Sequence, residues 1–163
     1  MSPVGFDACF RAHVGRLIAL GRAVSGDGEL ARDLAQEAFL RLHRHWDRLD
    51  DQGEIGPWLT RVMANLLIDH HRSAEAERRA VDRLHARTVV SSANAAAEID
   101  EWSNLVAGLP PRQRLIVTLH YGEDLSIEQI SRIIEVSPNT VKSALAKARA
   151  ALRAEKKRES DER

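Results

Sequence analysis

The residues whose types and spacing carry the most chemistry lie between 125 and 153. Ser126 and Gln129 have the spacing of a capping box, and Ser137-Pro138 provides an N-cap followed by proline at the first helical position. Only a short turn around Glu135 fits between these two helices. A short helix, a tight turn and a longer helix predict a helix-turn-helix, whose second helix enters the major groove of DNA.

The second helix of this pair has an apolar stripe and a polar face. Two apolar sets are expected to pack together: Ile127, Ile130 and Ile134 with Val141, Leu145, Ala148 and Leu152. The opposite face stays free, and residues 137–158 carry a net charge of +6, which suits phosphate. The residues expected to contact DNA bases or phosphates are Ser126, Ser137, Asn139, Thr140, Lys142, Ser143, Lys147 and Arg149. The competing interpretation is an amphipathic helix pair in an ordinary bundle.

Composition restricts the class of protein. The chain has 163 residues, with 24 Lys and Arg against 24 Asp and Glu, 44% hydrophobic residues and 4% aromatic residues. This balance favours a helical protein with a buried core over a disordered or all-β chain. The sequence has neither an apolar run near the roughly 20 residues of a membrane span nor a signal-peptide pattern. We therefore expect a cytoplasmic protein that does not insert into a membrane.

Catalytic and metal chemistry find little support in the sequence. The single cysteine, Cys9, excludes an intramolecular disulfide and a four-ligand Cys/His zinc framework. His43 and His45 are two residues apart and His70 and His71 are adjacent, whereas metal ligands on one helix face are three or four apart. We expect no enzyme activity, no cofactor and no metal site.

Apolar periodicity predicts an all-α fold of two small helical domains joined by a flexible linker. The first domain, 1–73, has helices over 6–24, 29–49 and 57–72, with a loop over 49–57 and Pro57 in the first turn of the third helix. Residues 74–96 lack a sustained apolar period and are predicted to be the linker. The second domain, 97–158, contains the helix-turn-helix, and 159–163 is predicted to be a disordered tail.

Residues 109–153, LPPRQRLIVTLHYGEDLSIEQISRIIEVSPNTVKSALAKARAALR, resemble region 4 of the extracytoplasmic-function (ECF) class of bacterial RNA polymerase sigma factors. The resemblance implies that the helix-turn-helix binds the −35 promoter element. Glu135 stands where that family commonly has glycine in the turn, and Ala144 stands where it commonly has arginine. A non-glycine residue with positive φ at this turn would cost about 1 kcal/mol.

Residues 33–49 resemble region 2.2 of the same family, through a D-x-x-Q-E-x-F pattern at 33–39. Ala35, Phe39, Leu42 and Trp46 are expected to face inward, which leaves an exposed leucine among charges. The resemblance implies that this outer face binds the β′ clamp helices of core polymerase, through Asp33, Gln36, Glu37, Leu40, Arg41 and Arg44. A solvated charged face with one stray leucine is the alternative.

Residues 57–72 resemble regions 2.3 and 2.4, which open and read the −10 element. With Leu59, Val62, Met63 and Leu66 inward, the outward stripe is Arg61, Asn65, Ile68 and Arg72. Amide and guanidinium groups suit single-stranded DNA, and by resemblance the loop over 49–57 captures a flipped base. Ile55-Gly56 replaces the family's usual aromatic and basic pair before the tryptophan.

These resemblances predict a minimal two-domain sigma factor. Its implied partners are core RNA polymerase, through the β′ clamp helices and the β flap, and promoter DNA, with an anti-sigma factor as a third partner that the sequence leaves open. The rival interpretation is a free-standing helix-turn-helix regulator that binds an operator as a dimer. Co-purification with core polymerase would separate the two.

Overall fold

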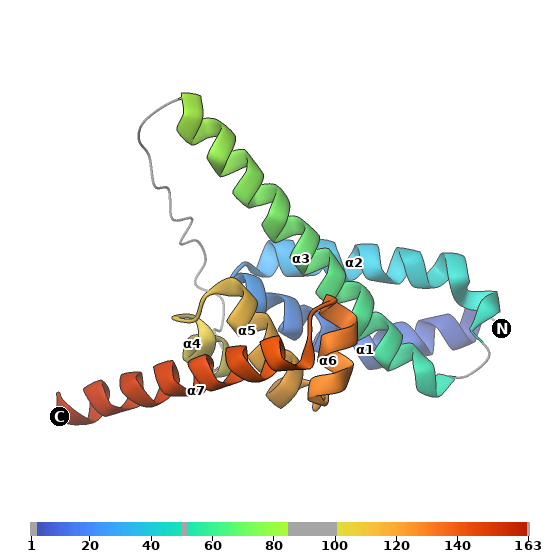
Figure 1. The fold of residues 1–163 in the computed structure, drawn as a ribbon. Coiled ribbons are helices and arrows are strands. Elements are labelled where there is room, and N and C mark those ends of the chain that lie inside the picture. The colour runs from blue at the N-terminus through green and yellow to red at the C-terminus, as the bar shows by residue number, and fades with distance from the viewer. Residues whose placement is uncertain (1–2, 50–51, 85–100, 163) are drawn as a thin grey trace.

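The computed structural model describes residues 3–49, 52–84 and 101–162 and is helical throughout its regular elements. The N-terminal domain contains α1 (Pro3–Ser25), α2 (Gly28–His45), the short 3₁₀ turn η1 (Trp46–Arg48) and α3 (Gln52–Leu84). The C-terminal domain contains α4 (Glu101–Val106), α5 (Pro111–Val117), the π-helical turn η2 (Thr118–Gly122), α6 (Ile127–Ile134) and α7 (Pro138–Asp161). Figure 1 shows α1, α2 and α3 as one bundle and α7 projecting from the second group of helices. The all-α fold with a helix-turn-helix is confirmed.

The N-terminal core forms where the three long helices approach each other most closely. Gly21 of α1 is buried, and a Cβ added there would lie 2.9 Å from Ala31 Cβ and would also collide with Met63 Cε. The predicted inward stripe of α2 is buried, with Leu42 fully covered, and Asp27 caps α2 by accepting from the amides of Glu29 and Leu30. Glycine at position 21 is thus what lets α2 and α3 pack directly on the α1 backbone.

The C-terminal core follows the predicted helix-turn-helix pattern. Ile130 and Ile134 of α6 are buried with Val141, Leu145 and Ala148 of α7. The capping box is present in both directions, because the Ser126 hydroxyl accepts from the Gln129 amide at 3.1 Å and Gln129 Oε1 accepts from the Ser126 amide at 2.8 Å. The two helix starts are therefore fixed by the residues that predicted them.

The loop predicted over 49–57 is wrong for residues 52–56, because α3 begins at Gln52. Pro57 is helical as expected, but it lies inside α3 rather than in its first turn. Ile55 is only 2% exposed, and Gly56 packs so closely on α1 that an added Cβ would lie 3.3 Å from His13 Cε1. This packing holds the segment in helical form despite the proline. Residues 50 and 51 of the predicted base-capturing loop lie outside the described residues.

The helices also extend further than their apolar periods predicted. Residues 74–84, assigned to the linker, continue α3, and residues 159–161, assigned to the tail, continue α7. Ala, Glu and Arg favour helix without burial, and His71–Glu75 at 3.4 Å and Glu75–Arg79 at 3.9 Å are i,i+4 pairs on α3. Figure 1 shows the end of α3 standing clear of both domains. Residues 85–96 of the predicted linker lie outside the described residues.

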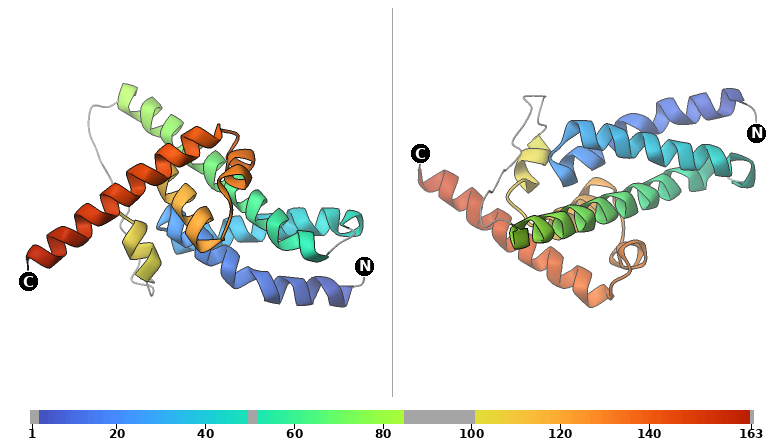
Figure 2. Two further views of the ribbon diagram at one scale, coloured as in Figure 1. Left: turned by 60° about the horizontal axis from the view of Figure 1, so that its bottom comes forward. Right: turned by 90° about the horizontal axis from the view of Figure 1, so that it is seen from above.

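The two domains contact each other along α1 and α3. α1 packs against α4, α5 and η2, and α3 packs against α6. The two views in Figure 2 show α5 and α6 lying beside the N-terminal bundle. In the part of the chain that the structure describes, no helix is both long and apolar enough to cross a bilayer.

Glu135 has the left-handed backbone expected where the family commonly has glycine, with φ 55° and ψ 50°. We predict that Glu135→Gly raises the free energy of unfolding by up to about 1 kcal/mol, because glycine adopts this conformation without a Cβ clash. Thermal and urea unfolding would measure the gain. Glu135→Ala keeps the Cβ and serves as the control, and an equal gain in that variant would contradict the explanation.

Candidate functional site

Four of the predicted DNA-contacting residues line one polar groove beside the N-terminal half of α7. We name this the recognition groove; its volume is about 480 Å³ and its lining residues are Pro110, Arg112, Gln113, Asn139, Thr140, Ser143, Ala144 and Lys147. Asn139, Thr140, Ser143 and Lys147 are all exposed. One wall therefore offers an amide, hydroxyls and an ammonium group, the groups that hydrogen-bond base edges and phosphates.

The opposite wall of the groove is formed by Arg112 and Gln113 in the first turn of α5, two residues that no sequence pattern marked. Arg112 is exposed and Gln113 half-buried, and both follow the Pro110-Pro111 pair that starts α5. A helix start is itself electropositive, and Arg112 adds a formal charge there. The prolines mark this helix start in the sequence, but only the fold shows that it faces α7.

The serine and threonine hydroxyls have a second role that competes with DNA contact. Ser137 Oγ accepts from the Thr140 amide at 3.2 Å and lies 2.9 Å from Thr140 Oγ1, while Ser126 Oγ caps α6. These three hydroxyls are engaged in holding helix starts. Their contact with DNA stays a prediction.

Lys142 and Arg149 are exposed but lie outside the recognition groove. Arg149 Nε donates to the Tyr121 hydroxyl at 2.7 Å, and its guanidinium carbon lies 5.8 Å from the centre of the Tyr121 ring. Tyr121 is 51% exposed, so this pair is an aromatic and cationic surface of the same domain. The predicted DNA-contacting residues of α7 thus lie partly in the recognition groove and partly on the exposed surface outside it.

A second, apolar groove runs between α1 and α2. Its volume is about 460 Å³ and it is lined by Phe6, Phe10, Val14, Ile18, Arg32, Ala35, Gln36, Phe39, Leu40 and His43. Leu40 is 48% exposed and Phe10 is 40% exposed, and because both line the same groove they form an apolar patch rather than two isolated exposed side chains. Phe10 has the helical spacing of Leu17, a buried residue of the same helix. It instead forms a floor for this groove, against Phe39 at 4.7 Å between ring centroids.

The other predicted docking residues form the charged border of the apolar groove. Glu37 and Arg41 make an i,i+4 ion pair at 2.9 Å, and Asp33 and Arg44 are exposed on the same side of α2. Of the predicted set, Gln36 and Leu40 line the groove itself. An apolar floor with a charged border is the usual anatomy of a protein interface.

The predicted single-strand stripe on α3 is exposed at three of its four residues. Arg61, Asn65 and Arg72 are exposed, and Ile68 is half-buried. The formal charge of the stripe comes from Arg61 and Arg72. Close to Gly56 at the start of α3, burial and the Arg16 charge lower the pKa of His13. The described residues contain no group of three or more His, Cys, Asp or Glu side chains placed to hold a metal ion.

Two family descriptions match the chain, one in each domain. Residues 9–77 match "Sigma-70 region 2" and residues 99–152 match "Sigma-70, region 4". The first match ends beyond the predicted boundary at 73, within the extended α3.

Curated relatives align along most of their length. The RNA polymerase sigma-E factor of Streptomyces avermitilis is 30% identical over 150 residues, which cover 92% of this chain and 84% of the relative. The ECF RNA polymerase sigma factor SigM of Bacillus subtilis is 31% identical, covering 81% and 83%. The solved structure of the sigma factor RpoE in complex with the anti-sigma factor NepR from Bartonella quintana has the same fold, with a TM-score of 0.69, 19% identity and coverage of 92% and 95%.

We predict that Lys147→Ala and Arg112→Ala each lower the slope of log affinity against log salt for duplex DNA by about one unit, because each would release one phosphate contact. Asn139→Ala should instead change the sequence preference and keep the slope. Titrations of a duplex library at several salt concentrations would measure both quantities. Equal binding profiles for all three variants would contradict the orientation of the groove.

Proposed function

This chain belongs to the sigma-70 family of RNA polymerase sigma factors, in its ECF group, and we propose that its three surfaces divide promoter recognition among them. The apolar groove with its charged border docks on core polymerase. The recognition groove reads duplex DNA at the −35 element. The α3 stripe meets the separated strand at the −10 element.

The apolar groove is the observation that favours a sigma factor over a free-standing helix-turn-helix regulator. A protein that acts on DNA alone needs the recognition groove but has no use for an exposed apolar floor at Phe10 and Leu40 on its other domain. A helical partner such as the β′ clamp helices would bury these side chains against α1 and α2. The Glu37–Arg41 pair at the border would then set orientation more than affinity.

The −35 assignment rests on the position of Asn139 and Ser143 near the start of α7. In a helix-turn-helix, the N-terminal residues of the second helix reach base edges, and later residues reach the backbone. Lys147 lies one turn beyond Ser143 and therefore suits a phosphate, with Arg112 on the opposite wall suiting a second one. Ala144 stands where the family commonly has arginine. Its methyl group leaves a small apolar surface in the recognition groove, which could contact the methyl group of a thymine.

The −10 assignment rests on the exposure of Arg61 and Asn65 on a rigid helix. Both side chains are free to meet a strand whose bases have left the stack. Because α3 includes residues 52–57, fewer residues before Trp58 are left to form a base-capturing loop than the sequence suggested. Strand capture therefore falls mainly to the stripe.

As a sigma factor the chain is an initiation factor and not an enzyme, so strand opening draws on binding energy alone. We propose that it acts in the cytoplasm with RNA polymerase. We also propose that an anti-sigma protein can mask it, since the fold-related RpoE is solved in complex with NepR. Run-off transcription with core polymerase across a promoter library tests the function as a whole, and failure to bind core polymerase would favour the free-standing regulator.

We predict that Leu40→Asp weakens core polymerase binding at least tenfold, because it places a charge in the apolar groove, while stability changes by less than about 0.5 kcal/mol. Leu105→Asp is the matched control, since Leu105 is 46% exposed on the other domain. Titration of core polymerase with labelled protein would measure the affinity. Equal loss in both variants would point to general unfolding.

We predict that Arg61→Ala combined with Asn65→Ala lowers promoter opening by roughly tenfold to a hundredfold, which corresponds to the loss of about 1 to 3 kcal/mol of strand contacts. A template with mismatches around −10 removes the unpairing cost, so activity should largely return on it. Permanganate reactivity of unpaired thymines would measure opening. Arg83→Ala, on the exposed end of α3, is the control, and normal opening by a folded double variant would contradict the role of the stripe.

A further inference from the structure

A row of four cations runs along α7 outside the recognition groove. Its members are exposed and lie at intervals of seven, four and three residues, which places them on one face of the helix: Lys142, Arg149, Arg153 and Lys156. We name this row the basic face, and at a rise of about 1.5 Å per residue it is about 21 Å long. The C-terminal half of α7 extends past the other helices of its domain (Figure 1), so the face is accessible to a large partner.

The charges of the basic face are not neutralised by neighbouring side chains. Arg149 and Arg153 are i,i+4 neighbours and Arg153 and Lys156 are i,i+3 neighbours, so each adjacent pair repels. Among the described residues, neither Arg153 nor Lys156 has an ion-pair or hydrogen-bond partner. Glu155 lies on another face and reaches the turn between α4 and α5, since a Cβ added at Gly108 would lie 3.7 Å from its Oε2. A helix with repelling cations on its outer face gains by binding a polyanion.

Tyr121 holds the guanidinium of Arg149 in a fixed orientation. Arg149 Nε donates to the Tyr121 hydroxyl at 2.7 Å, and the guanidinium carbon lies 5.8 Å from the ring centre. The Tyr121 ring packs edge-to-face on His120, at 4.7 Å between centroids, and His120 Nδ1 lies 2.8 Å from the Leu125 carbonyl oxygen. In the described part of the chain only Nε of Arg149 is engaged, which leaves both Nη groups for an anion. A side chain ordered in advance loses less entropy on binding.

Duplex DNA presents phosphates on both sides of a recognition helix. The major groove is about 12 Å wide and a helix with its side chains is about 10 to 12 Å across, so a helix fills the groove between the two backbones. Lys147 and Arg112 line the recognition groove on one side. Lys142 precedes Lys147 by five residues and is therefore turned from it by about 140° around the helix axis. Asn139 and Ser143, proposed to reach base edges, lie between these two directions.

We propose that the basic face binds the phosphates along one border of the major groove, with Arg149 positioned by Tyr121, while Lys147 and Arg112 bind those along the other border. The inference rests on the proposed −35 function and adds to it a second row of contacts that is independent of base sequence. Phosphates on one strand follow each other every 3.4 Å or so along the DNA axis, so a face of about 21 Å spans several of them.

Salt titrations of duplex DNA test the basic face on the full chain without polymerase. The probe is the tightest-binding duplex of the library titrations. Arg153→Ala with Lys156→Ala should lower the slope of log affinity against log salt by about two units, because each phosphate contact contributes about 0.9. The melting temperature should stay equal or rise, since the repulsion is removed. Arg78→Ala with Arg83→Ala removes the same charge from the exposed end of α3 and should leave the slope unchanged.

Lys147→Ala separates failure of the basic face from failure of the proposed function. An unchanged slope in the Arg153 and Lys156 double variant, beside a lower slope in Lys147→Ala, would overturn the basic face and leave the recognition groove standing. Unchanged slopes in both variants would overturn the −35 function itself. A basic face that does not touch DNA would instead suit an acidic protein surface.

Ethylation of single phosphates locates the two borders. Ethyl groups on both strands should interfere with binding of the unaltered chain. Arg149→Ala with Arg153→Ala should abolish the interference on one border, and Lys147→Ala with Arg112→Ala should abolish it on the other. Loss of the same phosphates in both double variants would overturn the arrangement.

Tyr121→Phe tests the positioning of Arg149, because it keeps the ring and removes the hydroxyl. The loss of one hydrogen bond should weaken duplex binding roughly twofold to tenfold. The salt slope should stay the same, since Arg149 keeps its charge. In an Arg149→Ala background, Tyr121→Phe should have no further effect. Equal weakening in both backgrounds would overturn the positioning role.

Discussion

The close approach of three helices at Gly21 is the constraint on which the rest of the N-terminal domain depends. With no side chain there, α2 and α3 rest on the α1 backbone, and the positions of both follow from that point. The apolar groove lies between α1 and α2, up to the contact of Phe6 with His43, and the stripe faces outward because Met63 is buried inward. Any larger residue would force Ala31 and Met63 apart and shift both surfaces together.

Sequence patterns predicted the parts of the fold that burial and capping decide. The buried apolar positions from Ala35 to Trp46 and the capping box at Ser126 are local signals, because each lies within a dozen residues of sequence. The predicted ends of the third helix were wrong because α3 is stabilised at one end by the buried Ile55 and at the other by helix propensity, and neither appears as an apolar period. Phe10 shows a limit of such patterns, since helical spacing shared with core residues does not show whether another helix covers a side chain.

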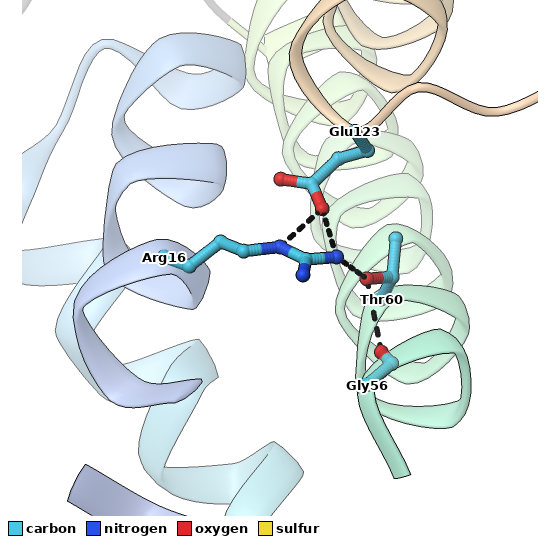
Figure 3. Close-up of polar contacts among 4 residues, drawn as sticks. All are labelled: Arg16, Gly56, Thr60 and Glu123. Atoms are coloured by element: carbon cyan, nitrogen blue, oxygen red, sulfur yellow. Dashed lines mark hydrogen bonds and ion pairs between the residues drawn. The ribbon is translucent and has the colours of Figure 1, made fainter. Parts of the chain in front are cut away.

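The candidate site residues also differ in whether local sequence or only the fold reveals them. Asn139, Ser143 and Lys147 could be assigned from the sequence because they share one helix face. Arg112 could not, because its place opposite that face depends on how α5 packs against α7. The ion pair between Arg16 of α1 and Glu123, which follows η2, joins residues 107 positions apart and has no local sequence signature, so only the fold reveals it (Figure 3).

The length of α3 gives the molecule a definite exit direction for the chain between its domains. Twelve residues beyond Arg72 continue the helix as a rod of about 18 Å, so the chain leaves from a fixed point in space and at a fixed angle around the axis. Each residue removed from this rod would retract the exit by about 1.5 Å and rotate it by about 100°. The end of α3 therefore acts as a spacer whose length sets both the distance and the direction of the helix end. A deletion of seven residues, close to two full turns, nearly preserves the angle around the helix axis. A deletion of two residues turns the helix end to the opposite side.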